Sequence, residues 1–178
     1  MVLQYRCIHF NKFLTKQKSY RAKKLIGFSD KQMYNVVADV KNYKQFLPFC
    51  KKSTILSSND NVMLANLEIG FPPVIENYTS KVTLIDSKLV KAECHDGRLF
   101  KYLETTWRFA PGLKSNPTTC IIDFYVNFEF HSLLHSQLSI MFFDGVVTQM
   151  ESAFIKEARR RYGMESIPSH PLSDVNNQ

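Results

Sequence analysis

Several features that support common chemistries are missing from this sequence. The chain has four cysteines, but no two lie close enough to form a CxxC pair, so neither a zinc site nor a redox site is expected. It has only six glycines and no glycine-rich phosphate loop. No stretch approaches the roughly 18 apolar residues of a spanning helix, so any membrane contact is expected to be peripheral.

Catalytic groups in a recognisable arrangement are missing too. His131 and His135 have the i,i+4 spacing that can hold a metal on a helix, but no HExxH motif accompanies them. Cys94, His95 and Asp96 are consecutive, and consecutive strand residues point to opposite faces, so they cannot act as a triad. The sequence therefore predicts no catalytic residue and no bound metal.

The sequence is rich in apolar and aromatic residues. Of its 178 residues 44% are hydrophobic, with 14 Phe and 8 Tyr, which fits one globular domain whose aromatic side chains line a cavity or only fill a core. The net charge of +7 suits nucleic acid or an anionic membrane. Because no nucleic-acid motif and no basic stripe with interleaved aromatic residues is visible, nucleic acid is not an expected partner.

The first 29 residues are basic and contain no acid. Their seven cationic residues are Arg6, Lys12, Lys16, Lys18, Arg21, Lys23 and Lys24. Such composition is typical of mitochondrial transit peptides, although a basic tail would look the same. We therefore expect a mitochondrial targeting segment at residues 1–18, one domain at 19–163 and a C-terminal tail at 164–178.

The domain is predicted to begin with a strand, at residues 19–28, and two helices. Ser29 is a suitable N-cap, and the helix that follows it places one apolar face toward the core. That face consists of Met33, Val36, Val37 and Val40. A shorter helix at 43–47 stops at Pro48, because proline has no N–H to donate.

About six strands and a long helix are predicted to follow. In the clearest strand, 119–130, every second residue from Cys120 to Phe130 is apolar, and the residues between them are mostly polar. The helix, from about 132 to 162, has an apolar stripe, and Gly163 suits the position after its end. Because the helix must bury this stripe against the sheet, we predict an α+β fold. It is a curved antiparallel sheet of about seven strands around a long C-terminal helix, with a space between them.

Side chains that face this space are the candidate ligand-binding residues. Leu67 alternates with Met63, Ala65 and Ile69 on one face of its strand, and Trp107 shares a face with the following Phe109. The predicted set is Leu67, Ile69, Trp107, Phe109, Phe124, Val126, Phe128, Val147 and Met150. We expect replacement of Trp107 by alanine to weaken ligand retention more than it unfolds the protein.

Two further segments are candidates for contact with a membrane. The loop from Gly70 to Ile75 is apolar and contains two prolines, so we expect Phe71, Val74 and Ile75 to face the membrane unless the loop is only a kinked strand edge. Arg159, Arg160 and Arg161 at the helix end either cap the helix or bind anionic lipid. We expect both segments on one side of the fold.

Four segments together resemble the coenzyme Q-binding START-domain family, within the wider polyketide cyclase/dehydrase-like group. They are residues 37–50 (VADVKNYKQFLPFC), 69–80 (IGFPPVIENYTS), 103–109 (LETTWRF) and 128–144 (FEFHSLLHSQLSIMFFD). The resemblance covers about residues 19–163. One departure is Gly145, where the family usually has a helix-forming residue.

The resemblance implies a START-like helix-grip fold whose hydrophobic tunnel holds coenzyme Q (ubiquinone), with no catalytic residue or catalytic cofactor. It also implies a peripheral place on the matrix side of the mitochondrial inner membrane. The implied role is that of a quinone carrier or chaperone supporting respiratory electron transport and coenzyme Q biosynthesis. Candidate partners are the coenzyme Q biosynthetic complex and the respiratory complexes.

Two other functions stay open at this point. A cyclase or aromatase acting on a quinone or polyketide precursor needs an ionisable group aimed into the cavity, and Glu76, Glu104 and Asp39 are the candidates. A ribosome-associated module is compatible with the basic charge, although no platform for stacking bases is visible.

Overall fold

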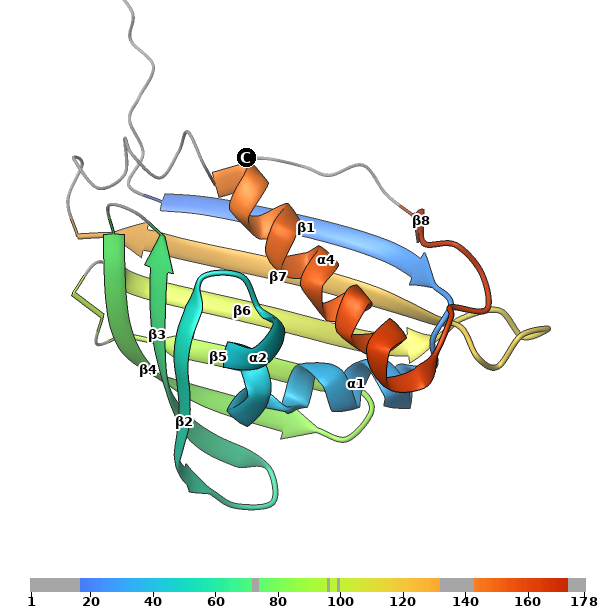
Figure 1. Ribbon diagram of the computed structural model, residues 1–178, viewed down its shortest axis with the longest axis horizontal. Coiled ribbons are helices and arrows are strands. Elements are labelled where there is room, and N and C mark those ends of the chain that lie inside the picture. Colours follow the sequence, from blue (N-terminus) through green and yellow to red (C-terminus); the bar gives the residue numbers. More distant parts are fainter. Residues whose placement is uncertain (1–16, 72–73, 96, 99, 132–142, 173–178) are drawn as a thin grey trace, which may run out of the picture.

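The computed structural model describes residues 17–71, 74–95, 97–98, 100–131 and 143–172 (Figure 1). The strands are β1 (Gln17–Ile26), β2 (Cys50–Ser58), β3 (Val62–Phe71), β4 (Val74–Ile85), β5 (Leu89–Cys94), β6 (Phe100–Pro111), β7 (Cys120–Phe130) and β8 (His170–Pro171). The helices are α1 (Asp30–Ala38), the 3-10 turn η1 (Val40–Asn42), α2 (Tyr43–Phe46) and α4 (Phe143–Tyr162).

All strands belong to one antiparallel sheet in the order β2-β3-β4-β5-β6-β7-β1-β8. The sheet curves, and α1, α2 and α4 lie against its concave face (Figure 1). This arrangement confirms the predicted α+β fold. The described strands number eight rather than about seven because the two-residue β8 pairs with β1.

The first helix starts where the sequence predicts. The Ser29 hydroxyl accepts a hydrogen bond from the Gln32 N–H at 3.2 Å, and the Gln32 side chain accepts one from the Ser29 N–H at 2.9 Å. This capping box satisfies two N–H groups that a helix end leaves open. Met33, Val36 and Val37 are fully buried, so the predicted apolar face is confirmed.

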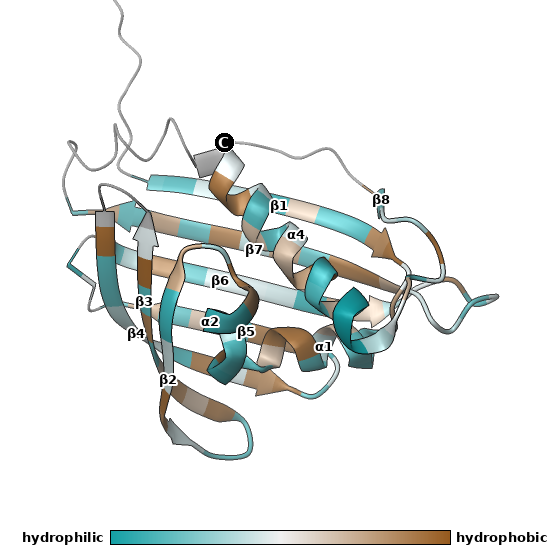
Figure 2. Cartoon of the chain, in the orientation of Figure 1, coloured by the Kyte–Doolittle hydropathy of each residue, from teal (hydrophilic) through white to brown (hydrophobic). Residues whose placement is uncertain are grey.

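Strand β7 confirms the period-2 pattern along its whole length. Every second residue from Cys120 to Phe130 is buried, and the residues between them are partly exposed. Figure 2 shows hydrophobic and hydrophilic residues mixed along the strands of the sheet. One face of the sheet therefore supplies the core, and the other faces solvent.

The predicted apolar loop at residues 70–75 is instead part of a hairpin, so that prediction is wrong for most of its length. Gly70 pairs with Ile75 and Phe71 pairs with Val74, which carries the β3–β4 ladder to the turn. Residues 72–73 lie outside the described part of the chain. A proline cannot donate to a ladder, but it is tolerated in the turn itself, so pairing continues up to the two prolines.

The long helix ends as predicted. Gly163 has φ 89° and its N–H donates to the Arg159 carbonyl at 2.9 Å, which is the left-handed cap that glycine favours. The helix runs through Gly145, and an added Cβ there would meet nothing within 4 Å. The predicted start of this helix, at about residue 132, lies outside the described residues.

The chain after α4 returns to β1. The Ser166 N–H donates to the Gly27 carbonyl at 2.9 Å, and the Leu172 N–H donates to the Lys23 carbonyl at 2.8 Å. β8 therefore lies in the predicted tail and extends the sheet beyond β1. The division into targeting segment, domain and tail stays a prediction.

Candidate functional site: an apolar cavity under the long helix

A cavity of about 110 Å³ lies between the concave face of the sheet and helices α2 and α4. Five strands, β3 to β7, contribute inward side chains to it. The lining comprises Val40, Tyr43, Leu47, Ala65, Leu67, Ile69, Tyr78, Ser80, Val82, Val90, Ala92, Leu103, Thr105, Trp107, Phe124, Met150 and Phe154. Most of these side chains are apolar, so the cavity is hydrophobic with a few polar groups, the usual composition of a small-molecule site.

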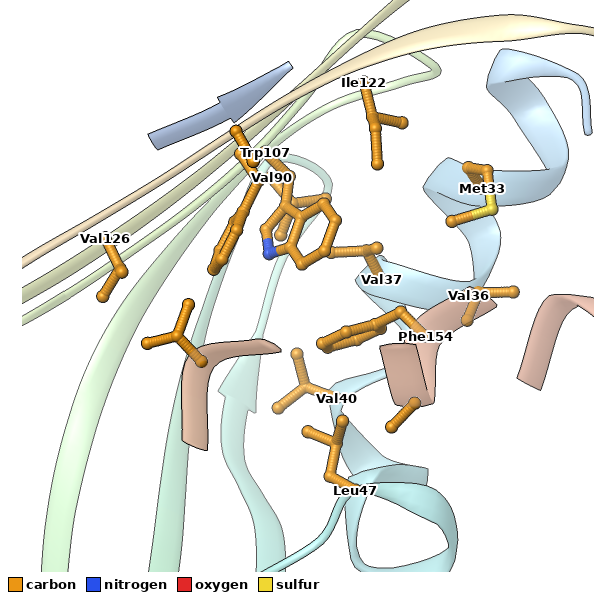
Figure 3. Close-up of a cluster of buried hydrophobic side chains, with 14 of the residues drawn as sticks. Met33, Val36, Val37, Val40, Leu47, Val90, Trp107, Ile122, Val126 and Phe154 are labelled. Atoms are coloured by element: carbon orange, nitrogen blue, oxygen red, sulfur yellow. The ribbon is translucent and has the colours of Figure 1, made fainter. Parts of the chain in front are cut away.

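Trp107 is the largest side chain in this lining and the only tryptophan of the chain. Its ring stacks on Phe124 of the neighbouring strand with centroids 4.3 Å apart, and it meets the ring of Phe154 at 4.9 Å. Figure 3 shows the indole projecting from the sheet toward Phe154, while Val40 and Leu47 approach from the helix side. Trp107 thus forms part of the cavity wall and part of the contact between the sheet and α4.

The polar groups of the lining are uncharged. They are the hydroxyls of Tyr43, Tyr78, Ser80 and Thr105 and the indole N–H of Trp107. Burial raises the pKa of both phenols above the ordinary value, so each phenol keeps its proton and can donate a hydrogen bond. The Tyr43 hydroxyl donates to the Val37 carbonyl at 2.5 Å. Within the part of the chain that the structure describes, the Tyr78 hydroxyl has no such partner.

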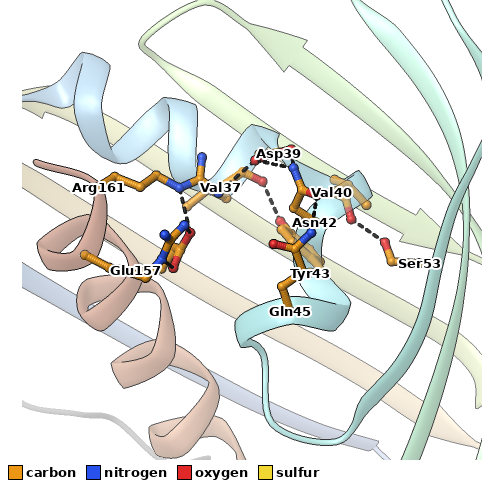
Figure 4. Close-up of polar contacts among 10 residues, drawn as sticks. Val37, Asp39, Val40, Asn42, Tyr43, Gln45, Ser53, Glu157 and Arg161 are labelled. Carbon is orange, nitrogen blue, oxygen red and sulfur yellow. Dashed lines mark hydrogen bonds and ion pairs between the residues drawn. The ribbon is translucent and has the colours of Figure 1, made fainter.

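Ionic contacts hold the C-terminal end of α4 against α1 (Figure 4). The Arg161 guanidinium donates to Asp39 and to Glu157, in both cases at 2.7 Å. Asp39 also accepts from the Asn42 amide at 2.9 Å. Hydrogen bonds from Arg160, and then from Arg161, lower the pKa of Glu157 to about 2, so this carboxylate stays ionised at neutral pH. These contacts fix one end of the helix that roofs the cavity.

A second ionic contact ties the middle of α4 to β1. The Glu151 side chain is 1% exposed, and its Oε1 lies 2.8 Å from the Lys24 ammonium, at ion-pair distance but without hydrogen-bond alignment. Its Oε2 accepts a long hydrogen bond of 3.4 Å from Tyr20. Because Met150 and Phe154 flank Glu151 on the same helix, this pair sets how both side chains meet the cavity.

The structure brings five of the nine predicted ligand-binding residues into the cavity lining: Leu67, Ile69, Trp107, Phe124 and Met150. The other four, Phe109, Val126, Phe128 and Val147, are buried but do not line this cavity. Phe109, for example, meets the ring of Tyr34 on α1 at 6.1 Å. Alternation places a residue on the correct face, but the position along the strand decides which helix covers it. A binding role for all nine stays a prediction.

The two predicted membrane segments lie at opposite ends of the sheet, so the expectation of one shared face is wrong. The β3–β4 hairpin lies at the end where β1 begins, whereas α4 runs toward the end where β1 stops at Ile26 (Figure 1). Each arginine is also paired with an acid: Arg159 with Glu165, Arg160 with Glu157 and Arg161 with Asp39. At the hairpin Ile75 is 70% exposed. The side chains of Phe71 and Val74 lie outside the described part of the structure.

The carboxylates that a cyclase would need lie outside the cavity lining. Glu104 accepts hydrogen bonds from Tyr102 and Thr106, and Asp39 belongs to the Arg161 contact. Glu76 is buried close to Gly97, where an added Cβ would lie 2.9 Å from its Oε1. None of the three side chains therefore lines this cavity.

The remaining candidates for chemistry are the cysteines and histidines. Cys50, Cys94 and Cys120 are buried and not joined in a disulfide, and Cys7 and His135 lie outside the described residues. Among the described residues no cluster of His, Cys, Asp and Glu could hold a metal ion. None of the described helices combines the length and the apolar character needed to cross a membrane.

Comparison with known proteins finds clear similarity. The family described as polyketide cyclase / dehydrase and lipid transport matches residues 26–155. The mitochondrial coenzyme Q-binding protein COQ10 of Drosophila melanogaster is 52% identical over 166 residues, which cover 93% of this chain and 69% of that protein. The mitochondrial COQ10 homolog B of Xenopus laevis is 53% identical over 86% of this chain and 63% of its own length.

Similarity of fold extends to enzymes. The crystal structure of the Zhui aromatase/cyclase from Streptomyces sp. R1128 matches with a TM-score of 0.70 at 14% sequence identity, covering 82% of this chain and 95% of that one. At this identity the likeness shows a shared helix-grip architecture alone.

Proposed function

This chain belongs to the polyketide cyclase / dehydrase and lipid transport family, and from that premise we propose that it is a non-enzymatic carrier of coenzyme Q. The observation that carries the proposal is the cavity under α4, which combines apolar walls with uncharged hydrogen-bond donors. A quinone has the matching chemistry, because its ring carbonyls accept hydrogen bonds and its isoprenoid tail is apolar. The names of the two relatives, both coenzyme Q-binding proteins, point to the same ligand.

The energetics suit a carrier. Burial of apolar groups contributes about 0.8 kcal/mol for each CH₂-sized group, so one five-carbon prenyl unit contributes roughly 4 kcal/mol. Association costs about 4–15 kcal/mol in lost freedom of movement. A few buried prenyl units therefore offset that cost without any chemical step.

The two alternative functions have less support. A cyclase-type enzyme would use an acid or base in the cavity, whereas Glu76, Glu104 and Asp39 lie outside its lining. A ribosome-associated module would use an unpaired basic face, whereas Arg159, Arg160 and Arg161 are each bonded to a carboxylate.

The place of action that we propose is the matrix side of the mitochondrial inner membrane. Both relatives are named as mitochondrial, and the acid-free basic residues 1–18 suit a targeting segment. There the protein would serve respiratory electron transport and coenzyme Q biosynthesis, with the corresponding complexes as candidate partners.

The direct test of the carrier function is to extract the purified protein with organic solvent and to analyse the extract by mass spectrometry. We expect coenzyme Q at a substantial molar fraction of the protein. Bound RNA, or a polyketide in place of quinone, would contradict the carrier function.

We also propose that the protein docks on the membrane with its β3–β4 hairpin rather than with its arginine cluster. Replacement of Ile75 by serine is expected to reduce binding to cardiolipin-containing vesicles by roughly tenfold, because a buried isoleucine contributes about 1.5–3 kcal/mol. Vesicle flotation measures this effect. The matched control is Ile85→Ser, since Ile85 is 48% exposed at the other end of β4. Equal flotation of the two variants would rule the hairpin out as the docking site.

A further inference from the structure

The cavity under α4 is small for a complete coenzyme Q molecule. Its volume is about 110 Å³, whereas an apolar cavity of about 150 Å³ in another protein holds a single benzene ring. Pockets that enclose drug-sized ligands usually measure about 300–1,000 Å³. This space therefore holds only part of the ligand, and the rest of a bound quinone lies outside it.

A second, larger space lies directly outside it. The groove between α2 and α4 has a volume of about 630 Å³. Its lining comprises Gln45, Phe46, Leu47, Pro48, Thr148, Gln149, Ser152, Ala153, Lys156, Glu157 and Arg160. The side chains contributed from the α2 side are largely apolar, and the charged ones come from the last turns of α4, so the groove suits an apolar chain that stays partly exposed.

Leu47 borders both spaces, and it is the one residue that both linings share. It is 6% exposed and stands at the C-terminal cap of α2 in an extended conformation, with φ −76° and ψ 127°. Phe49, two residues later, has φ 67°, a conformation that a bulky L residue rarely adopts. Strained backbone of this kind is found preferentially at segments that switch or clamp a ligand. Leu47 is thus the side chain that lies between the cavity and the groove.

The hydrogen-bond donors decide which end of the ligand goes inside. Tyr78 and Ser80 are two residues apart on β4 and face the cavity together, and Thr105 on β6 is separated from them by β5 alone. The protonated Tyr78 hydroxyl has no partner among the described residues. Ring carbonyls could use these donors, whereas a prenyl chain would leave them unsatisfied, which is unfavourable in a buried site.

We propose that the quinone ring binds in the inner cavity with a carbonyl oxygen accepting a hydrogen bond from Tyr78, and that the isoprenoid tail leaves past Leu47 into the groove between α2 and α4. This inference rests on the proposed carrier function. It assigns Tyr78 as a ring-binding residue and Ser152, on the α4 wall of the groove, as a neighbour of the tail.

The single tryptophan offers a readout of ring position. Trp107 lies in the inner cavity, so a quinone ring bound there should quench its fluorescence. The probes are 2,3-dimethoxy-5-methyl-1,4-benzoquinone, which has no tail, and the analogue with two isoprene units. Titration of the full chain with each probe gives two dissociation constants. We expect both probes to quench and the tailed probe to bind more tightly.

Two variants separate the ring site from the tail site. Tyr78→Phe is expected to weaken both probes about five- to tenfold, the loss of one hydrogen bond. Its control is Tyr125→Phe. Tyr125 is half-buried and lies between the inward residues of β7, so this change should leave both dissociation constants unchanged. Ser152→Phe is expected to narrow the groove and to weaken the tailed probe about tenfold, with the tail-less probe as its internal control.

The possible failures are distinguishable. If neither probe quenches wild-type Trp107 and no quinone is extracted from the protein, the carrier function itself fails. If quinone is bound but Tyr78→Phe behaves like Tyr125→Phe, or if Ser152→Phe weakens both probes equally, the carrier function stands and the proposed orientation is overturned.

Discussion

Replacement of Trp107 by alanine is expected to destabilise the domain by about 3–5 kcal/mol, the usual cost of removing a large aromatic side chain from a core. The indole is 4% exposed and packs against both Phe124 and Phe154, so its loss opens a void between the sheet and α4. In a domain of this size each kcal/mol lowers the melting temperature by about 2–4 °C. Thermal and urea denaturation of the purified variant measure the effect.

The same variant is expected to lose quinone binding even where it stays folded. The matched control is Phe109→Ala, because Phe109 lies two residues further along the same face of β6, is equally buried, and packs under α1 rather than in the cavity. We expect the two variants to lose similar stability. At a temperature where both are folded, Phe109→Ala should retain quinone and Trp107→Ala should not. If both retain it equally, Trp107 serves only the core.

The contrast between these two residues shows how far the sequence pattern reaches. Alternation in β6 correctly placed Trp107 and Phe109 on the buried face, as alternation in β7 did for Phe124. It contains no information about which helix lies above each inward position, because that depends on how α1 and α4 cross the sheet. Local patterns therefore predicted the elements, the faces and the caps, and tertiary packing decided which buried residues line the cavity.

One pair of candidate site residues was missed and one group was misplaced, for a related reason. The side chains of Tyr78 and Ser80 point inward from β4. Polar residues at inward positions of a strand were a usable signal that a cavity, rather than a packed core, lies above them. The arginines at the end of α4 were predicted to share a face with the β3–β4 hairpin. Their place at the opposite end follows from the direction in which α4 crosses the sheet (Figure 1). That direction depends on contacts between residues distant in sequence, so a local pattern does not predict it.

A charged residue at an inward position of a strand is a further signal of this kind, and Lys24 on β1 is an example. Tyr20, Ala22 and Ile26 are buried inward residues of β1. Lys24 occupies an inward position of the same strand, and its ammonium forms an ion pair with Glu151. A charge placed among core positions needs a partner, because an unpaired buried ion is strongly unfavourable. The pair therefore fixes α4 across β1 at a point between Met150 and Phe154.

Replacement of Lys24 by methionine is expected to destabilise the protein by roughly 3 kcal/mol, because it leaves the fully buried Glu151 carboxylate without a cation. This is the lower end of the usual range, since the Lys24 side chain is 23% exposed and water reaches it. Lys23→Met, the same change at the exposed neighbour, should cost little. The double variant Lys24→Met with Glu151→Leu should regain most of the lost stability, since two packed apolar side chains often replace a buried ion pair without loss. Urea denaturation of the wild type and the three variants measures these changes, and a double variant as unstable as Lys24→Met would show that Glu151 stabilises α4 through contacts other than Lys24.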